Sequence, residues 1–438
     1  MKKQIIENYE QAVQYLYDVP RFTKKSTMED TRRHLAALGN PDHGMKIIHI
    51  AGTNGKGSVC AYLRSILNEA GYSCGVFTSP HLVECRERFA IDGEMVSEET
   101  FYEAFMQVYE SLDWGALETG EGYHPTFFEY LFFMGMLIFA KEKPDFCILE
   151  TGLGGRLDAT NAVEKKELAV ITRIGMDHME YLGNTLEEIA GEKAGIIMEG
   201  VPVVYLDEVK EASGVICKVA AKKGALLEGV SKRDYAYLNF KNKSIDFSYY
   251  SRYYEYVRVC LHTIAHYQME NAALAIRAAE VLDAGRSITK SHIEEGLAKA
   301  FWAGRMEEVR REFYVDGAHN EDGIRAFLQT VSMDGWQGSR HLLCSVVRDK
   351  DYLSMIQALA DSGLFCKITV AQLESGRATP IAELLNIWKQ YTKQDIQVFT
   401  SVDEAVKSVL ANQEADERIY AAGSLYLVGE IKGVLKRC

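Results

Sequence analysis

The sequence predicts an α/β protein with two domains. The chain has 438 residues, which is too long for one hydrophobic core of ordinary size. Short apolar runs, typical of buried parallel strands, alternate with helical stretches along most of its length. A second alternation of the same kind begins near residue 304. We therefore expect a larger domain over residues 1–300, built on a mostly parallel sheet, and a smaller α/β domain over residues 301–438.

The first sheet is expected to open with a strand, a glycine-rich loop, a helix and a second strand. Residues 46–50 are the first strand and residues 52–58 the loop. The helix ends at Gly71, and residues 74–78 follow as the next strand. Further buried-strand candidates are residues 146–149, 169–172 and 201–205. Their alternation with helices is typical of a parallel sheet covered on both faces.

Residues 234–259 have a different pattern. Tyr and Phe alternate with polar residues there, and Asn242-Lys243 interrupts the alternation as a turn. This pattern predicts a small antiparallel sheet at the side of the first domain.

The C-terminal part again alternates strands with helices. Its strand candidates are residues 312–315, 341–346, 367–370, 396–399 and 418–421. Ser401 and Glu404 have the spacing of a capping box at the start of one of the helices between them. We expect a Rossmann-like α/β domain. Its boundary, near residues 297–304, is placed by the change of pattern because no proline-rich linker marks it.

Composition excludes several classes of protein. A formal net charge of −13 argues against binding to nucleic acid, which needs concentrated Lys and Arg. The longest apolar run, residues 127–140, contains Glu129 and is shorter than the about 20 residues that span a bilayer. The N-terminus shows no secretory signal, and nine cysteines without paired spacing indicate reduced thiols. We expect a cytoplasmic protein that binds neither nucleic acid nor membrane.

The glycine-rich loop is a candidate phosphate-binding loop of the P-loop type. Its glycines let backbone amides converge on phosphate oxygens, and the helix N-terminus adds positive potential. Lys56 would neutralise phosphate charge, and Ser58 is able to approach a metal ion. One glycine separates these two residues, so the loop departs from the standard Walker pattern. The alternative is an ordinary glycine-rich turn. The expected nucleotide-binding residues are Thr53, Asn54, Gly55, Lys56, Gly57 and Ser58.

This loop resembles that of the Mur-ligase superfamily, and Thr78-Ser79-Pro80-His81-Leu82 resembles its folate branch, the folylpolyglutamate synthase and dihydrofolate synthase family. Matching motifs continue in order at residues 150–161, 177–178, 192–196, 268, 271, 316–320, 349–351 and 423–426. The resemblance implies an ATP-dependent ligase that joins L-glutamate to a reduced folate through an acyl-phosphate. It also implies a monomer whose partners are these small molecules.

Glu150 and His178 each follow a predicted strand, so both belong at the carboxyl edge of the sheet beside the loop. One oxygen and one nitrogen ligand suit a magnesium ion that also binds ATP phosphates and water. The resemblance implies that Ser79, Glu150 and His178 are the magnesium ligands. Taken alone, His178 is more often a structural histidine and Glu150 a capping carboxylate.

Lys193 follows a capping box made by Thr185 and Glu188, so it belongs to a helix that this box starts, and it lies 15 residues beyond His178. The resemblance implies that carbon dioxide carbamylates Lys193, which turns a cation into an anion. It also leaves room for a monovalent cation as a further cofactor. The ordinary alternative is an exposed lysine on a helix.

The resemblance places further residues on the nucleotide. Asn271, Arg305 and Asp316 would contact it, with Arg305 on the phosphates and Asp316 on the adenosine side. His319 would lie near the transferred phosphate, which makes Lys56, His178, Lys193 and His319 the expected catalytic residues. The alternative for Arg305 is a surface ion pair with Glu307 or Glu308. We expect ATP to bridge the two domains.

Which folate ligase this is depends on weaker signals. Bifunctional members often carry Leu-Gly-Leu-Glu-Arg near the N-terminus, whereas residues 19–25 here are Val-Pro-Arg-Phe-Thr-Lys-Lys, which favours extension of folates only. Asp158, in the segment matched to the pteroate site, keeps the dual activity open. Arg377 is a candidate for the glutamate carboxylates, with a solvent-exposed cation as its alternative. A nucleotide-binding regulator and a peptidoglycan-precursor ligase are the rival functions.

Overall fold

Eight strands form the main sheet of the computed structural model, which describes residues 3–19, 27–283 and 287–437. Their order is β4-β3-β2-β5-β1-β6-β7-β8. They are β1 (Ile47–Ala51), β2 (Cys74–Phe77), β3 (Phe89–Ile91), β4 (Glu94–Met95), β5 (Phe146–Glu150), β6 (Leu168–Ile171), β7 (Val203–Leu206) and β8 (Leu227–Val230). Among the described residues of this sheet, β3 alone runs in the opposite direction to the other strands, so the predicted mostly parallel sheet is confirmed.

Helices cover both faces of this sheet because its strands are apolar on both sides. Ile48 and Ile50 of β1 share one core with α3, α10 and α11, while Ile47 and Ala51 face the other side. The bounds are α1 (Tyr9–Asp18), α2 (Met28–Ala37), α3 (Lys56–Glu69), η1 (Cys85–Arg88), α4 (Glu98–Glu110), α5 (Trp114–Thr119), α6 (Phe127–Glu142), η2 (Ala159–Ala162), α7 (Met179–Leu182), α8 (Leu186–Ala194), α9 (Lys210–Lys222), α10 (Gln268–Asp283) and α11 (Lys290–Lys299).

The apolar run at residues 127–140 is helix α6, and it lies in the core as predicted. A capping box between Thr126 and Glu129 starts the helix, because the Thr126 hydroxyl and the Glu129 carboxylate satisfy each other's backbone N–H groups. In the described part of the chain, no helix is long and apolar enough to cross a membrane.

The predicted side sheet is also present. β9 (Tyr235–Lys241), β10 (Ser244–Tyr249) and β11 (Val257–Leu261) pair antiparallel in the order β11-β10-β9. Asn242 and Lys243 both adopt positive φ, as a tight hairpin turn requires. Phe247 of β10 and Val259 of β11 are buried against the same core as α10.

The C-terminal sheet has the order β12-β13-β17-β14-β15-β16 and is parallel except for β12. Its strands and helices are β12 (Glu307–Arg310), β13 (Phe313–Val315), α12 (Glu321–Met333), β14 (Ser339–Cys344), α13 (Tyr352–Asp361), β15 (Lys367–Ala371), α14 (Ile381–Tyr391), β16 (Ile396–Phe399), α15 (Val402–Ala411), β17 (Glu417–Ala422) and α16 (Leu425–Arg437). Helices α12 to α14 cover one face and α15 and α16 the other, so the predicted α/β class is confirmed.

One local prediction in this domain is half wrong. The Ser401 hydroxyl accepts a hydrogen bond from the Glu404 backbone N–H at 3.2 Å, as a cap should. The Glu404 carboxylate, however, accepts its hydrogen bond from the Thr400 hydroxyl at 2.9 Å. The hydroxyl of the preceding residue takes the carboxylate, so the reciprocal half of the box does not form with Ser401.

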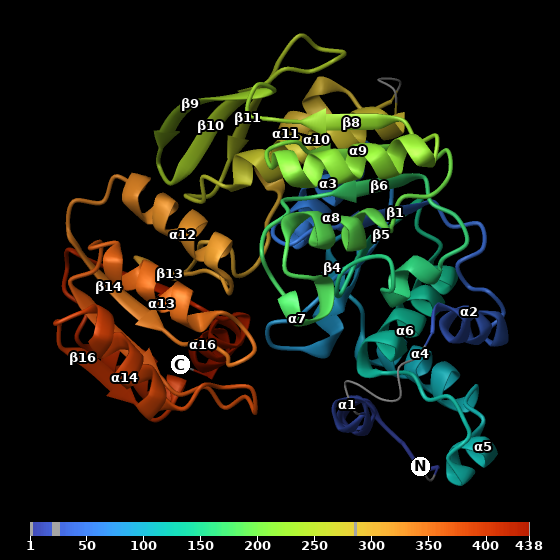
Figure 1. Cartoon of the computed structure of the whole chain (residues 1–438), viewed down its shortest axis with the longest axis horizontal. Coiled ribbons are helices and arrows are strands. Elements are labelled where there is room, and N and C mark those ends of the chain that lie inside the picture. Colours follow the sequence, from blue (N-terminus) through green and yellow to red (C-terminus); the bar gives the residue numbers. More distant parts are fainter. Residues whose placement is uncertain (1–2, 20–26, 284–286, 438) are drawn as a thin grey trace.

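The two parts of the chain meet beside the carboxyl edge of the main sheet. In Figure 1 the C-terminal domain, coloured orange to red, lies to the left of the main sheet and its helices. Asn320 of this domain pairs with Asn54 of the phosphate loop. The turn of the β9–β10 hairpin reaches across, where Lys243 Nζ lies 2.7 Å from Glu308 Oε1 and 3.0 Å from Glu312 Oε1. The side sheet therefore contacts both domains.

Candidate active site

The phosphate loop connects β1 to α3 in a conformation that only glycine tolerates. Gly52 and Gly55 have φ of 156° and 90°. A Cβ on Gly52 would come within 1.8 Å of Thr172 Oγ1, and one on Gly55 within 2.3 Å of Asn271 Oδ1. A Cβ on Gly57, in the first turn of α3, would come within 2.6 Å of the indole of Trp302 in the interdomain linker. The loop is packed against three separate segments, so it is more than an ordinary turn.

Polar contacts fix the loop to the segment that follows β6. Thr53 N–H donates to the Arg173 carbonyl at 2.8 Å, and Thr53 Oγ1 lies 3.1 Å from the Gly175 N–H that donates to it. The Thr172 hydroxyl donates to the Asn54 carbonyl at 2.7 Å. The loop backbone is thus held in place from one side, and its helical end faces the C-terminal domain.

Lys56 and Lys193 converge on the same backbone carbonyl. Lys56 Nζ lies 3.1 Å and Lys193 Nζ 2.8 Å from the Gly52 oxygen, to which both amines donate. Lys193, on α8, is only 4% exposed, so it is not the exposed helical lysine of the alternative interpretation. Burial and the nearby Lys56 lower the pKa of Lys193 to about 7. Much of its amine is therefore neutral near physiological pH.

Glu150 is the last residue of β5, and His178 follows β6 as the N-cap of α7, in the order that the sequence predicted. Glu150 is buried, and its Oε2 accepts a hydrogen bond from the Ser79 backbone N–H at 3.0 Å. Its Oε1 lies 3.9 Å from Lys56 Nζ. Burial raises the pKa of Glu150, and Lys56 opposes that rise. His178 has a left-handed backbone, and its Nε2 lies 2.9 Å from Lys350 Nζ.

This donor set fits magnesium bound together with a nucleotide. Among the described residues no group of three or more His, Cys, Asp or Glu side chains is arranged to hold a metal by itself. Magnesium does not need such a group, because it usually binds one or two carboxylates and takes its other ligands from phosphates and water. The buried Glu150 carboxylate matches that preference, and Ser79 lies next to it through its backbone N–H. The His178 imidazole is a nitrogen donor, which magnesium uses less often than oxygen.

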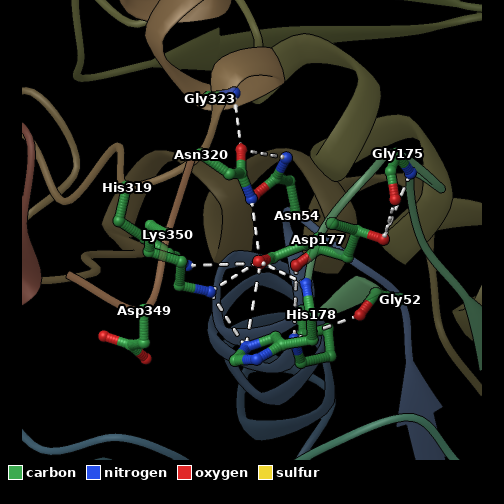
Figure 2. Close-up of polar contacts among 12 residues, drawn as sticks. Gly52, Asn54, Gly175, Asp177, His178, His319, Asn320, Gly323, Asp349 and Lys350 are labelled. Atoms are coloured by element: carbon green, nitrogen blue, oxygen red, sulfur yellow. Dashed lines mark hydrogen bonds and ion pairs between the residues drawn. The ribbon is translucent and has the colours of Figure 1, made fainter. Parts of the chain in front are cut away.

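Asp177 is the centre of the polar contacts shown in Figure 2. Its Oδ1 accepts a hydrogen bond from Lys350 Nζ at 2.5 Å, and its Oδ2 accepts one from Asn320 Nδ2 at 3.1 Å. Burial opposes ionisation of Asp177, but Lys350, His178 and His319 hold its pKa below the ordinary value. Asp177 is a site residue that the sequence motifs alone do not identify. Its position next to His178 was the available signal.

Asn320 joins the C-terminal domain directly to the phosphate loop. Its side-chain amide pairs reciprocally with that of Asn54, with both N–O distances at 3.1 Å. Asn320 is also the N-cap of α12, because its Oδ1 accepts the Gly323 N–H at 2.8 Å. The sequence placed Asn320 and Lys350 in motifs without assigning them a site function.

His319 lies beside this cluster as a neutral imidazole. Its Nδ1 donates to the Gly317 carbonyl at 2.8 Å, which leaves Nε2 facing Asp177 Oδ2 at 3.8 Å. Burial and the charge of Lys350 lower the pKa of His319 to about 3. The structure therefore brings His319 to the phosphate-loop edge, together with Lys56, His178 and Lys193.

Asn271 lies under the start of α3. Its Nδ2 donates to Gln268 Oε1 at 2.9 Å, and Gln268 Nε2 donates to the Ser58 hydroxyl at 3.1 Å. This chain of amides links α10 to the first turn of α3. Gln268 belongs to a sequence motif, but the sequence alone does not identify this contact.

Arg305 lines a cleft between the domains, together with Tyr62, Trp302 and Tyr314. The expected alternative partners of Arg305 are otherwise engaged. Glu307 pairs with Lys432 at 2.6 Å, and Glu308 pairs with the hairpin residue Lys243. The cleft opens next to Gln268, so it continues toward the phosphate loop.

Asp316 is buried below this cleft and holds the linker. Its carboxylate accepts hydrogen bonds from the Tyr267 hydroxyl at 2.5 Å, the Met306 N–H at 3.0 Å and the Ala318 N–H at 2.8 Å. Burial raises the pKa of Asp316, and Arg305 opposes the rise. An adenosine contact for Asp316 stays a prediction.

The two substrate candidates occupy different settings. Asp158 is buried and caps η2, because its carboxylate accepts hydrogen bonds from the Leu153 N–H at 2.8 Å and from the Thr160 N–H at 3.0 Å. Arg377 is half-buried in an ion pair with Asp349, and its NH1 donates to the Tyr426 hydroxyl at 3.1 Å. Arg377 is therefore not a free solvent-exposed cation. Neither geometry tests a substrate role.

The chain matches two protein families along most of its length. Residues 50–279 match the Mur ligase middle domain, and residues 304–425 match the Mur ligase, glutamate ligase domain. The dihydrofolate synthase/folylpolyglutamate synthase of Bacillus subtilis (strain 168) is 36% identical over 98% of this chain and 99% of its own length. The folylpolyglutamate synthase of Lacticaseibacillus casei is 29% identical over 98% of this chain and 99% of its own.

Solved structures of such proteins share the fold. Folylpolyglutamate synthase from Thermotoga maritima superposes with a TM-score of 0.83 at 30% identity, covering 98% of this chain and 96% of that one. A complex of FPGS with AMPPCP and folate gives 0.84 at 27% identity, covering 98% of this chain and 100% of that one. E. coli FolC in complex with DHPP and ADP gives 0.84 at 28% identity, covering 98% of both.

Proposed function

Because the chain belongs to the folylpolyglutamate synthase and dihydrofolate synthase family of Mur ligases, we propose that it adds L-glutamate to the γ-carboxylate of a reduced folate, using ATP. It is an ATP-dependent ligase of that family. The observation that carries the proposal is the arrangement of side chains at the phosphate loop. Lys56 and Lys193 both donate to the Gly52 carbonyl. Asn320 and Lys350 of the C-terminal domain contact the same region from the other side.

A second candidate is the bifunctional enzyme, which also joins glutamate to dihydropteroate. The B. subtilis relative carries both activities in its name, and it is the relative that supports this candidate. The N-terminal signal for extension only, at residues 19–25, lies outside the described residues from residue 20 onward. Asp158 belongs to the segment matched to the pteroate site, where an extension-only enzyme and a bifunctional enzyme would differ in substrate binding.

Amide formation from a carboxylate needs a leaving group better than oxide. A carboxylate oxygen of the folate attacks the γ-phosphorus of ATP, the bond to the β-phosphate oxygen breaks, and ADP leaves. The glutamate amine then attacks the acyl carbon, loses a proton, and inorganic phosphate departs. The protein contributes mainly position and electrostatics, with the loop amides and Lys56 facing the charge that develops on the phosphoryl oxygens.

The remaining site residues take the roles expected from the sequence. Ser79, Glu150 and His178 would hold magnesium, which supplies positive charge at the phosphoryl oxygens when it is bound. Asn271, Arg305 and Asp316 would bind the nucleotide in and below the cleft, and His319 would lie near the transferred group. Arg377 would bind a glutamate carboxylate, and a monovalent cation is a further expected cofactor. Contact between the domains at Asn320 excludes water from the acyl-phosphate.

Carbamylation of Lys193 is part of the proposal. Its buried amine, with a pKa of about 7, supplies the neutral form that attacks carbon dioxide, with loss of a proton as the N–C bond forms. We expect Lys193→Ala to fold and to lose turnover by about 100-fold or more, the scale of removing one electrostatic group from an active site. Formate or acetate should restore part of the kcat of this variant. Full activity of Lys193→Ala would remove the carbamate from the mechanism.

The deciding experiment supplies purified protein with magnesium, ATP and glutamate, and adds either tetrahydrofolate or dihydropteroate. Mass spectrometry follows the ligated product and colorimetry the phosphate, with Lys56→Ala protein as the background control. Product from tetrahydrofolate alone supports extension only, and product from both acceptors supports the bifunctional enzyme. ATP hydrolysis without either product would overturn the proposal in favour of the nucleotide-binding regulator. Cytoplasmic location and a monomeric state stay predictions.

A further inference from the structure

Lys350 extends from the C-terminal domain into the phosphate-loop edge of the N-terminal domain. It follows β14 and precedes α13, whose N-cap is Asp351. Its side chain is 7% exposed, and its Nζ contacts Asp177 Oδ1 at 2.5 Å and His178 Nε2 at 2.9 Å (Figure 2). The lysine thus spans the domain boundary at the point where the expected catalytic residues meet.

Lys350 and Lys56 lie in the same region from different domains. Lys56 Nζ donates to the Gly52 carbonyl of the phosphate loop, and Lys350 Nζ contacts Asp177 and His178. Asp177 is the carboxylate that contacts Lys350, while Glu150 lies beside Lys56 at 3.9 Å. Charge-assisted hydrogen bonds from lysine to phosphate oxygens are strong. A triphosphate bound at the loop would therefore meet Lys56 from the first domain and Lys350 from the second.

The contact with His178 carries a second consequence. An ammonium group has no acceptor, so Lys350 donates and His178 Nε2 accepts with its single lone pair. The same lone pair is the one that His178 would offer to a metal ion. Lys350 and a metal ion therefore cannot use this nitrogen at the same time.

The contact with Asp177 has no such conflict. Asp177 Oδ2 is held by Asn320 at 3.1 Å, so the carboxylate stays in place when Lys350 gives up the histidine. Lysine has three N–H donors. One stays on Asp177, and two become free to donate to an anion beside the loop.

We propose that Lys350 occupies the metal-binding nitrogen of His178 as a place-holder and, when a divalent cation takes that nitrogen, donates to the γ-phosphoryl group of ATP. The inference rests on the proposed function, because it names a phosphate-binding residue that the C-terminal domain adds to the same site. When the metal–nucleotide complex binds, Lys350 of the second domain therefore forms a contact with the nucleotide that the first domain cannot supply.

The test compares Lys350→Met with Lys432→Met, a control in the same domain whose lysine pairs with Glu307 away from the loop. Electron paramagnetic resonance measures binding of Mn²⁺, as the probe cation, in the presence of ADP. Removing the competitor should tighten Mn²⁺ binding several-fold in Lys350→Met and leave it unchanged in Lys432→Met. Unchanged or weaker Mn²⁺ binding in Lys350→Met would overturn the place-holder role.

Calorimetry with AMPPCP and ADP tests whether Lys350 contacts the γ-phosphoryl group. The intact chain should bind AMPPCP more tightly than ADP, and Lys350→Met should lose that preference by about 10-fold or more, the scale of one charge-assisted contact. An unchanged ratio of the two dissociation constants would overturn the phosphate contact. Thermal unfolding checks the fold, and Lys350→Gln, which keeps an N–H donor toward Asp177 without the charge, replaces Lys350→Met if that variant unfolds.

Neither readout contains folate or glutamate. Failure of the folate assay with the unaltered chain would therefore contradict the proposed acceptor and leave the Lys350 measurements interpretable. Failure of the Lys350 measurements with normal folate turnover would contradict this inference alone.

Discussion

Lys166 is a second buried lysine of the main sheet region, and it lies away from the phosphate loop. Its side chain donates to Asn161 Oδ1 at 2.6 Å and to the Ile196 carbonyl at 2.9 Å. These bonds tie the loop around Asp158 to the segment after α8, which carries Lys193. Burial lowers the pKa of Lys166 from 10.5 to about 7. A buried amine of this kind couples the stability of the fold to pH.

The sign of that coupling follows from the two pKa values. Between pH 7 and pH 10 the unfolded chain binds a proton at Lys166 that the folded chain mostly lacks, so stability rises with pH. We expect the stability of the unaltered chain, relative to Lys166→Met, to increase by about 2 kcal/mol from pH 7.5 to pH 9, at up to about 1.4 kcal/mol per pH unit. Urea unfolding at both pH values measures the difference. Lys165→Met, at an exposed neighbour, should follow the unaltered chain.

Helix α3 begins and ends with glycines in the same left-handed conformation. Gly55 precedes its first turn with φ of 90°, and Gly71 follows its last turn with φ of 87°. A Cβ on Gly71 would meet nothing within 4 Å, whereas one on Gly55 would collide with Asn271. A substitution at either glycine would therefore strain the backbone, but only a substitution at Gly55 would also crowd the phosphate loop.

Alanine at these two positions gives a matched pair. Both Gly55→Ala and Gly71→Ala should lose about 1–2 kcal/mol of stability, because an L-residue is disfavoured in the left-handed region. Only Gly55→Ala should also weaken ADP binding, by more than 10-fold, since its new methyl displaces Asn271 and the loop. Calorimetry with ADP and thermal unfolding report the two effects separately. Equal ADP affinity in both variants would show that the loop tolerates the displacement.

At the scale of the whole molecule, contacts between the domains assemble the site. Asn320 pairs with Asn54 and contacts Asp177, Lys350 contacts Asp177 and His178, and the separate hairpin contact of Lys243 lies farther along the boundary. Catalysis in this arrangement requires the two domains to keep their relative position within about an ångström.

Asn320→Ser tests that requirement. Serine is also a good N-cap, so α12 should keep its start and the loss of stability should be about 1 kcal/mol. The cross-domain amide pair disappears, however, and we expect kcat for glutamate ligation to fall about 10- to 100-fold. Limited proteolysis of the linker at residues 300–304 should become faster. A variant with normal kcat and normal proteolysis would show that the amide pair does not position the domains.

Local patterns were enough for most of the strands and for the phosphate loop. Apolar alternation placed the predicted strands, the turn at Asn242 and Lys243, and the buried helix α6, because periodicity and turn chemistry act over a few neighbouring residues. The short strands β3, β4, β8 and β12 were not predicted. The capping prediction at Ser401 was only half correct, because the adjacent hydroxyl of Thr400 competes for the Glu404 carboxylate. Such competition is decided by side-chain geometry that spacing does not contain.

The sequence by itself determined the α/β class and the positions of Lys56, Glu150, His178 and Lys193 at one sheet edge, because parallel strands bring their carboxyl ends together. Only the tertiary structure decided which side chains complete that edge. Asp177 meets Asn320 across 143 positions of the chain and Lys350 across 173. The choice of partners over such separations depends on how the second domain docks, because burial and hydrogen-bond geometry select among many polar residues that no local pattern distinguishes.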